Sequence, residues 1–134
     1  MRTKFVVVTL LALLAASVIM SSAQNKKSRA TKEFMRDKLE LTQGILEGLA
    51  VENFDLILSR SQRLSAMSQE VGWKVFENPD YEQQSIAFRR NVDALTKAAK
   101  NKNLDGATLA YVRATMSCVE CHKYVRGRLV ASLN

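Results

Sequence analysis

Cys118-Val119-Glu120-Cys121-His122 is the stretch that organises this chain, because it holds both cysteines and the single histidine of the 134-residue sequence. Two thiols at this spacing lie on one face of a helix, one turn apart. A histidine that directly follows the second thiol completes the spacing of covalent c-type haem attachment. Each thiol adds across one haem vinyl group, and the imidazole ligates the iron. The stretch therefore predicts one covalently attached haem c.

Three other interpretations of this pentapeptide fit the sequence less well. A structural zinc site needs four protein ligands, and no further cysteine or histidine is present, so a carboxylate would have to complete the set. A thioredoxin-like dithiol normally sits in a strand–helix unit, and the strand pattern is missing. A disulfide within one helical turn would close a very small loop with poor geometry. Haem attachment is the interpretation that we carry forward.

The amino-terminal segment has the three parts of a secretory signal peptide. Basic residues precede an apolar run from Phe5 to Met20, and small residues follow up to Ala23. The run is shorter than the ~20 residues that a membrane-spanning helix needs. We expect a signal peptide at residues 1–23, a mature domain at 24–134, and export to the periplasm without stable membrane insertion. Export agrees with the motif, because bacteria attach c-type haem outside the cytoplasmic membrane.

The charge of the mature chain limits its partners. Cleavage after Ala23 removes two of the 20 basic residues and leaves 18 against 13 acidic ones, a formal charge of +5. A moderately basic surface favours an acidic protein partner or an anionic membrane surface. The basic residues are scattered rather than clustered with aromatic ones, so we expect no nucleic-acid ligand. Redox partner proteins are the expected partners, and the sequence leaves open whether the chain also forms a homodimer.

Hydrophobic periodicity near 3.6 residues predicts an all-α domain of four amphipathic helices. The expected helices cover about residues 30–49, 53–69 and 79–100, followed by a last helix that starts after Asn103 and carries the motif. Asn78 is a favourable N-cap, and Pro79 suits the first helical position. The very short link between the first two helices makes them antiparallel neighbours. We therefore expect an antiparallel four-helix bundle.

Apolar spacing predicts which face of each helix points inward. The expected stripes are Met35, Leu39, Thr42, Leu46 and Leu49, widened by Phe34, Leu41 and Ile45; Phe54, Ile57, Leu64, Met67 and Val71; Tyr81, Phe88, Val92, Leu95 and Ala99; and Leu104, Tyr111, Cys118, His122 and Val125. Gly44 and Gly48 each weaken the first helix by ~1 kcal/mol, so they indicate close approach by a neighbour or the helix end. Trp73, in the longest link, either caps the core or lies against a haem edge.

The whole pattern resembles the cytochrome c′-like, or class II, c-type cytochromes. Four amphipathic helices are joined by short outer links and a longer middle link, and the CxxCH motif lies near the end of the last helix. The resemblance covers essentially the whole mature chain and is strongest from Asn103-Leu104-Asp105 to Arg126. Class I cytochromes c carry the motif near the amino terminus instead. One departure is Val125, where the family often has an aromatic residue.

The resemblance implies a role for each residue of the motif. Cys118 and Cys121 would be the thioether attachment sites, and His122 would be the proximal iron ligand. Arg126 would lie near the exposed edge of that histidine or near a haem propionate, although a cation favoured by the helix macrodipole is an equally good interpretation. The resemblance also implies that the first helix meets the opposite haem face. Family members with methionine there are six-coordinate electron carriers, and those with an apolar residue there bind diatomic gases.

Met35 is the expected sixth ligand, because it lies on the inward stripe of the first helix in the region where the family places its distal ligand. Met67 is expected to fill the core. Met116 comes two residues before Cys118, so it points away from the haem face. An iron without a sixth protein ligand is the remaining alternative.

The sequence contains no catalytic constellation, so we do not expect an enzyme. The expected function is one-electron transfer between redox partners by an exported monohaem cytochrome. The alternatives are a five-coordinate cytochrome that binds nitric oxide or carbon monoxide, and a subunit whose haem serves a larger complex.

Overall fold

The computed structural model describes residue 26 and residues 28–131. Residues 28–50 form a first helix. It is followed by α2 (Phe54–Met67), the short 3-10 helix η1 (Val71–Trp73), α3 (Pro79–Lys100) and α4 (Leu104–Ala131). The predicted signal peptide at residues 1–23 lies outside the described residues. Among the residues that are described, no helix is both long and apolar enough to cross a membrane.

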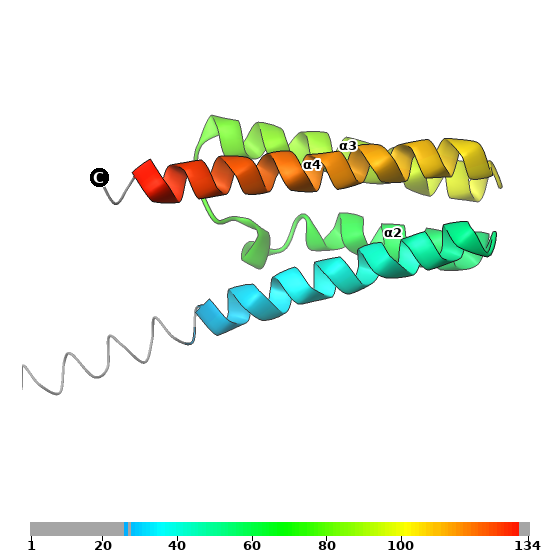
Figure 1. Ribbon diagram of the computed structural model, residues 1–134, viewed down its shortest axis with the longest axis horizontal. Helices are drawn as coiled ribbons and strands as arrows, with labels where there is room; N and C mark the ends of the chain where they lie inside the picture. Colours follow the sequence, from blue (N-terminus) through cyan, green and yellow to red (C-terminus); the bar gives the residue numbers. More distant parts are fainter. Residues whose placement is uncertain (1–25, 27, 132–134) are drawn as a thin grey trace, which may run out of the picture. The chain divides into compact units, whose positions relative to one another are not determined.

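The chain divides into two compact units, Met1–Arg36 and Asp37–Asn134. Within the second unit, consecutive helices run in opposite directions (Figure 1). α3 packs against both α2 and α4. The residues described in this unit contain helices and no strand, so the predicted antiparallel four-helix bundle is confirmed.

An asparagine caps the first turn of α2, α3 and α4. The Oδ1 atoms of Asn53, Asn78 and Asn103 each accept a hydrogen bond from the backbone N–H three residues ahead, at 3.0, 2.9 and 2.8 Å. Such side-chain caps satisfy backbone donors that have no partner within the helix. Pro79 occupies the first helical position of α3. The cap predicted at Asn78 is confirmed, and the last helix starts after Asn103 as predicted.

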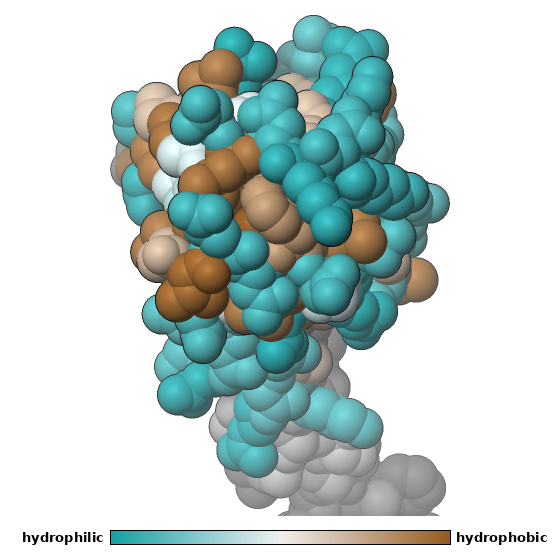
Figure 2. Space-filling model, turned by 90° about the vertical axis from the view of Figure 1, so that its right-hand side faces the viewer, coloured by the Kyte–Doolittle hydropathy of each residue, from teal (hydrophilic) through white to brown (hydrophobic). Residues whose placement is uncertain are grey.

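The two short links between helices each turn through a residue with a left-handed backbone. Glu52 has φ 55° between the first helix and α2, and Lys102 has φ 51° between α3 and α4. Both links lie at the right-hand end of the bundle in Figure 1, and Figure 2 looks onto that end. Hydrophilic and hydrophobic side chains are mixed over the surface of this end. The long link with η1 lies at the other end of the bundle.

The predicted core face of α3 is confirmed, and that of α2 is confirmed in part. All five apolar residues expected on α3 are buried. On α2, Ile57, Leu64 and Met67 are buried, but Val71 lies beyond the end of that helix with 89% of its surface exposed. The expected stripe therefore ran one turn too far on α2.

The predicted inward face of the first helix is confirmed in part, because three of its expected residues are buried and two are exposed. Leu39 and Leu46 are 57% and 53% exposed, whereas Leu41, Ile45 and Leu49 are buried. Gly48 explains the rotation, because its backbone packs against the start of α2. A Cβ at this position would lie 2.8 Å from Cγ1 of Ile57. The face that carries Gly48 must therefore turn inward, and it brings Leu41 and Ile45 with it.

α4 contributes small residues to the core. Ala107, Ala110, Ala114 and Ser117 are its buried residues. Asn91 of α3 donates a hydrogen bond to the Ser117 hydroxyl at 2.8 Å. Small side chains allow α3 and α4 to approach closely along this face, and they leave little apolar surface of α4 in the core.

Candidate functional site

Cys118 and Cys121 lie one turn apart on α4, as the motif predicts. Both are half-buried, and they are not joined as a disulfide. Cys118 donates a hydrogen bond to the carbonyl oxygen of Ala114, with an Sγ–O distance of 3.3 Å. Burial raises the pKa of both thiols, so both are protonated at neutral pH. Two neutral thiols therefore stand on one face of a long, straight helix.

His122 follows on the edge of the same face, and its side chain is exposed. The prediction that it lies on the core face of α4 is wrong, because the alanines and Ser117 occupy the centre of that face. Partial burial lowers the pKa of His122, and the positive charges of Lys38 and Arg126 lower it further. The neutral imidazole that results is the form that ligates metal ions.

Arg126 lies one helical turn beyond His122 and is exposed. Its charge acts on the imidazole, as the lowered pKa of His122 records. The proximity of Arg126 to His122 agrees with the expectation that Arg126 lies near the exposed edge of the imidazole. A propionate contact and a favourable interaction with the helix macrodipole both stay predictions.

Lys38 is the residue of this site that sequence reasoning missed. It belongs to the first helix, and its side chain is half-buried. Burial lowers the pKa of Lys38 to about 8, while the nearby Cys118 and Cys121 oppose that shift. The charge of Lys38 therefore comes close enough to interact with both thiols from a different helix. One signal was available: Lys38 precedes the buried Ile45 by seven residues, which places it on the same face of the helix.

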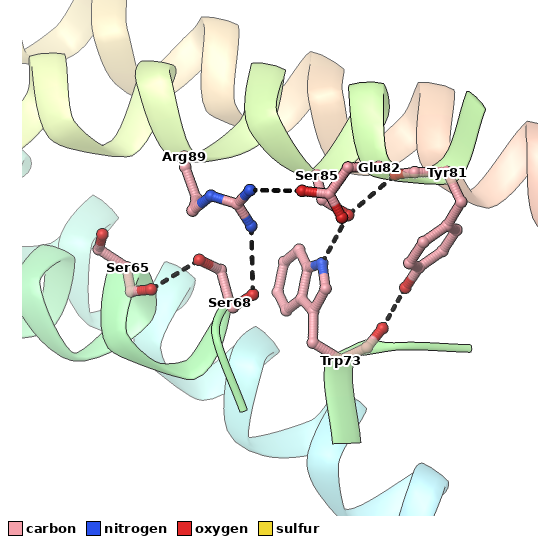
Figure 3. Close-up of polar contacts among 7 residues, drawn as sticks. All are labelled: Ser65, Ser68, Trp73, Tyr81, Glu82, Ser85 and Arg89. Atoms are coloured by element: carbon pink, nitrogen blue, oxygen red, sulfur yellow. Dashed lines mark hydrogen bonds and ion pairs between the residues drawn. The ribbon is translucent and has the colours of Figure 1, made fainter. Parts of the chain in front are cut away.

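Trp73 forms the wall beside Lys38. The Lys38 Nζ lies 3.8 Å from the centroid of the Trp73 ring. The indole is buried, donates a hydrogen bond to the Ser85 hydroxyl at 3.0 Å, and packs 4.8 Å from the Phe88 ring between centroids. The Tyr81 hydroxyl donates to the Trp73 backbone carbonyl (Figure 3). Trp73 thus caps the core, as one of the two interpretations predicted, and its contact with a haem edge stays a prediction.

A polar cavity of about 580 Å³ lies on the other side of this link, between α3 and the segment after α2. Arg89 crosses it and pairs with the Glu82 carboxylate at 3.0 Å while donating to the Ser68 carbonyl at 3.4 Å (Figure 3). The thiols and the imidazole do not line this cavity. Its one lining arginine already has a carboxylate partner, so the cavity has no strong net charge.

The three methionines considered as iron ligands have different positions. Met67 is buried in the core, as predicted, with 1% of its surface exposed. Met116 is exposed, which agrees with the expectation that it points away from the site. Met35 is half-buried and belongs to the unit that ends at Arg36, whereas the thiols belong to the other unit. Its ligation of iron stays a prediction.

The chemistry of these residues fits haem c better than the alternatives. The two thiols and the neutral imidazole share one helix, and an aromatic wall and a cation lie nearby. Across the described part of the chain, no three histidine, cysteine, aspartate or glutamate side chains are grouped closely enough to hold a metal ion. A zinc site completed by a carboxylate therefore finds no support, whereas thioether attachment needs only the two thiols.

Comparisons with known proteins support the fold. No protein-family model matches the chain, and no match is found among curated proteins. A solved structure of a cytochrome c′ aligns with a TM-score of 0.59 and 15% sequence identity, covering 75% of this chain and 94% of that chain. The chain therefore has the cytochrome c′ fold, and the resemblance predicted from the sequence is confirmed at the level of the fold.

Proposed function

We propose that this chain is an exported member of the cytochrome c′-like family, which carries one covalent haem and transfers single electrons between redox partner proteins. The observation that carries the proposal is the pair of free thiols next to a neutral imidazole on the last helix of a cytochrome c′ fold. Cys118 and Cys121 would hold the haem as thioethers, and His122 would ligate its iron. The bound haem would supply one-electron chemistry.

The surrounding residues keep the motif in a fixed position. Ser117 accepts a hydrogen bond from Asn91 at 2.8 Å just before the first thiol. The Tyr124 hydroxyl donates to Oδ1 of Asn78 at 2.9 Å just after the imidazole. α4 is therefore tied to α3 on both sides of the motif. Fixed ligands suit electron transfer, because the site need not rearrange when the iron changes its oxidation state.

Covalent attachment is tested by denaturing the purified protein in acidic organic solvent. Haem should stay on the polypeptide, because thioether bonds survive the loss of the fold. Replacing either Cys118 or Cys121 by alanine should weaken attachment, and replacing both should abolish it. Met116→Ala, which changes an exposed residue on the same helix, is the matched control and should retain haem. Haem that extracts freely from the unmodified protein would sink the proposal.

Carbon monoxide separates electron transfer from the gas-binding alternative. We expect a six-coordinate iron in both oxidation states, so carbon monoxide should bind slowly or weakly to the reduced protein. Binding of carbon monoxide is measured from absorption spectra of both oxidation states, recorded with and without the gas. Rapid binding would favour the five-coordinate, gas-binding function over electron transfer.

A further inference from the structure

We propose that Lys38 supplies a positive charge at the haem site, and that this charge would raise the reduction potential of a haem held by the motif. This inference rests on the proposed function, because it concerns how the chain's own residues act on a haem held by the motif. It names a residue that neither the motif nor the fold assigns.

The position of Lys38 follows from which helices carry the groups. The two thiols and the imidazole belong to α4, and Lys38 belongs to the first helix. The charge of Lys38 acts on Cys118, Cys121 and His122 alike. A haem held by Cys118, Cys121 and His122 would therefore come within reach of the same charge, supplied from a different helix.

The contacts of Lys38 keep it at this position. Its Nζ lies 3.8 Å from the centroid of the Trp73 ring, within the range of a cation–π interaction. The indole donates a hydrogen bond to Ser85, and the Trp73 backbone carbonyl accepts one from Tyr81, so two contacts hold Trp73 against α3. Lys38 also lies on the helix face that turns Leu41 and Ile45 into the core. The ammonium group therefore lies against the Trp73 ring and does not extend freely into solvent.

The charge state of Lys38 is suited to this role. Burial lowers its pKa to about 8, so the side chain carries its proton at neutral pH. The contact with the electron-rich indole face also favours the protonated form. Reduction of the haem adds one negative charge, which a nearby cation stabilises more strongly in a partly desolvated site than in water. The ammonium group should therefore favour the reduced state.

Three variants of the full, haem-loaded chain separate the effect of the Lys38 charge on the reduction potential from the effect of its packing. Lys38→Gln removes the charge, and Lys38→Arg keeps it, because arginine stays protonated in proteins. Lys97→Gln makes the same change in charge at an exposed position in the last turn of α3. Reduction potentials are measured by potentiometric titration at constant ionic strength. Covalent haem content and circular dichroism confirm that each variant is loaded and folded.

We expect Lys38→Gln to shift the ferric/ferrous equilibrium about tenfold toward the ferric form, a fall of ~59 mV for one electron. Lys38→Arg and Lys97→Gln should remain close to the unmodified protein. An unchanged potential in Lys38→Gln would overturn the inference, as would an equal fall in Lys38→Arg. If Lys38→Gln does not fold, Lys38→Leu provides the same comparison with an apolar side chain. Loss of covalent haem from the unmodified protein would instead refute the proposed function.

Discussion

At the scale of single residues, Met35 and Lys38 are expected to act on a bound haem in different ways. They are three residues apart on one helix. A thioether that binds iron closes the coordination site and favours the reduced state. A protonated amine cannot bind the metal and acts through its charge alone. Lys38→Gln should therefore lower the reduction potential without changing the coordination number, whereas Met35→Leu should change both.

Met35→Leu tests the sixth ligand predicted from the sequence. The exchange conserves volume, so it should keep the fold and cost less than ~1.5 kcal/mol of stability. We expect the variant to bind carbon monoxide readily and to have a lower reduction potential than the unmodified protein. Spectra with the gas and a potentiometric titration make the measurement. Rapid binding in the unmodified protein, unchanged in Met35→Leu, would mean that Met35 only packs.

The lowered pKa of Lys38 predicts how stability depends on pH. The value falls from 10.5 to about 8, so between these pH values the unfolded chain holds this proton more often than the folded chain. The free energy of unfolding then rises with pH in this window, because the cost of burying the cation disappears.

This dependence is measured as the difference in free energy of unfolding between the haem-loaded protein and Lys38→Gln. The difference should move in favour of the unmodified protein as the pH rises from below 8 toward 10.5. Other titrating groups are present in both proteins, so their contributions largely cancel. A difference that stays constant across the window would contradict the burial of Lys38.

At the scale of helices, Gly48 and Gly44 form a matched pair for testing the contact that orients the first helix. A Cβ on residue 48 would meet Cγ1 of Ile57 at 2.8 Å and the Asn53 carbonyl oxygen at 3.2 Å. Gly48→Ala should therefore force the helices apart and cost about 1–3 kcal/mol.

The matched substitution at Gly44 should have a different effect on stability. A Cβ on residue 44 would meet only the flexible side chain of Arg60, at 3.2 Å or more. Gly44→Ala should be neutral or stabilise the protein by up to ~1 kcal/mol, because alanine favours the helix. Denaturant unfolding of the haem-loaded variants, followed by circular dichroism, measures both. Equal effects of the two substitutions would contradict the proposed contact.

The same contact shows why the sequence predicts helices better than their orientations. The caps at Asn78 and Asn103 are local, so the start of each of these helices could be predicted. The first helix has leucines on two adjoining faces, and hydrophobicity alone does not choose between Leu39 and Leu41. The choice is made by Gly48 against α2, a contact between residues that periodicity treats separately.

The residues of the candidate site likewise differ in whether they could be predicted from the sequence. Cys118, Cys121 and His122 could be predicted, because their spacing is itself the chemical requirement. Lys38 could not be, because a lysine beside an apolar stripe normally extends its charged end into water. Its burial depends on Trp73, which reaches the site from an irregular link with no periodic signal.

At the scale of the whole molecule, the bundle should depend on haem for its stability. The buried residues of α4 are three alanines and one serine, which bring little apolar area to the core. The thiols are half-buried and the imidazole is exposed, so this part of α4 is incompletely covered by protein. A haem would supply the missing apolar surface. Burial of apolar surface is the main favourable contribution to folding.

Removing the attachment sites tests this dependence. The Cys118→Ala/Cys121→Ala double variant should lose the sharp, cooperative unfolding of the haem-loaded protein while keeping much of its helix signal. Thermal and denaturant unfolding followed by circular dichroism make the comparison. A haem-free chain that unfolds with unchanged midpoint and cooperativity would show that the protein core is sufficient alone.

The position of the thiols along α4 has a consequence for electron exchange with docked partners. Cys118 lies fourteen residues beyond Leu104, the first residue of α4, so ~21 Å of helix separates it from the end with the two short turns. Electron exchange weakens steeply with distance, and a partner that docks on those turns would exchange electrons slowly. Under the proposed electron-transfer function, donor and acceptor would therefore both dock away from these turns, one after the other. Such a protein would work as a shuttle that releases one partner before it meets the next, rather than by joining two partners at once.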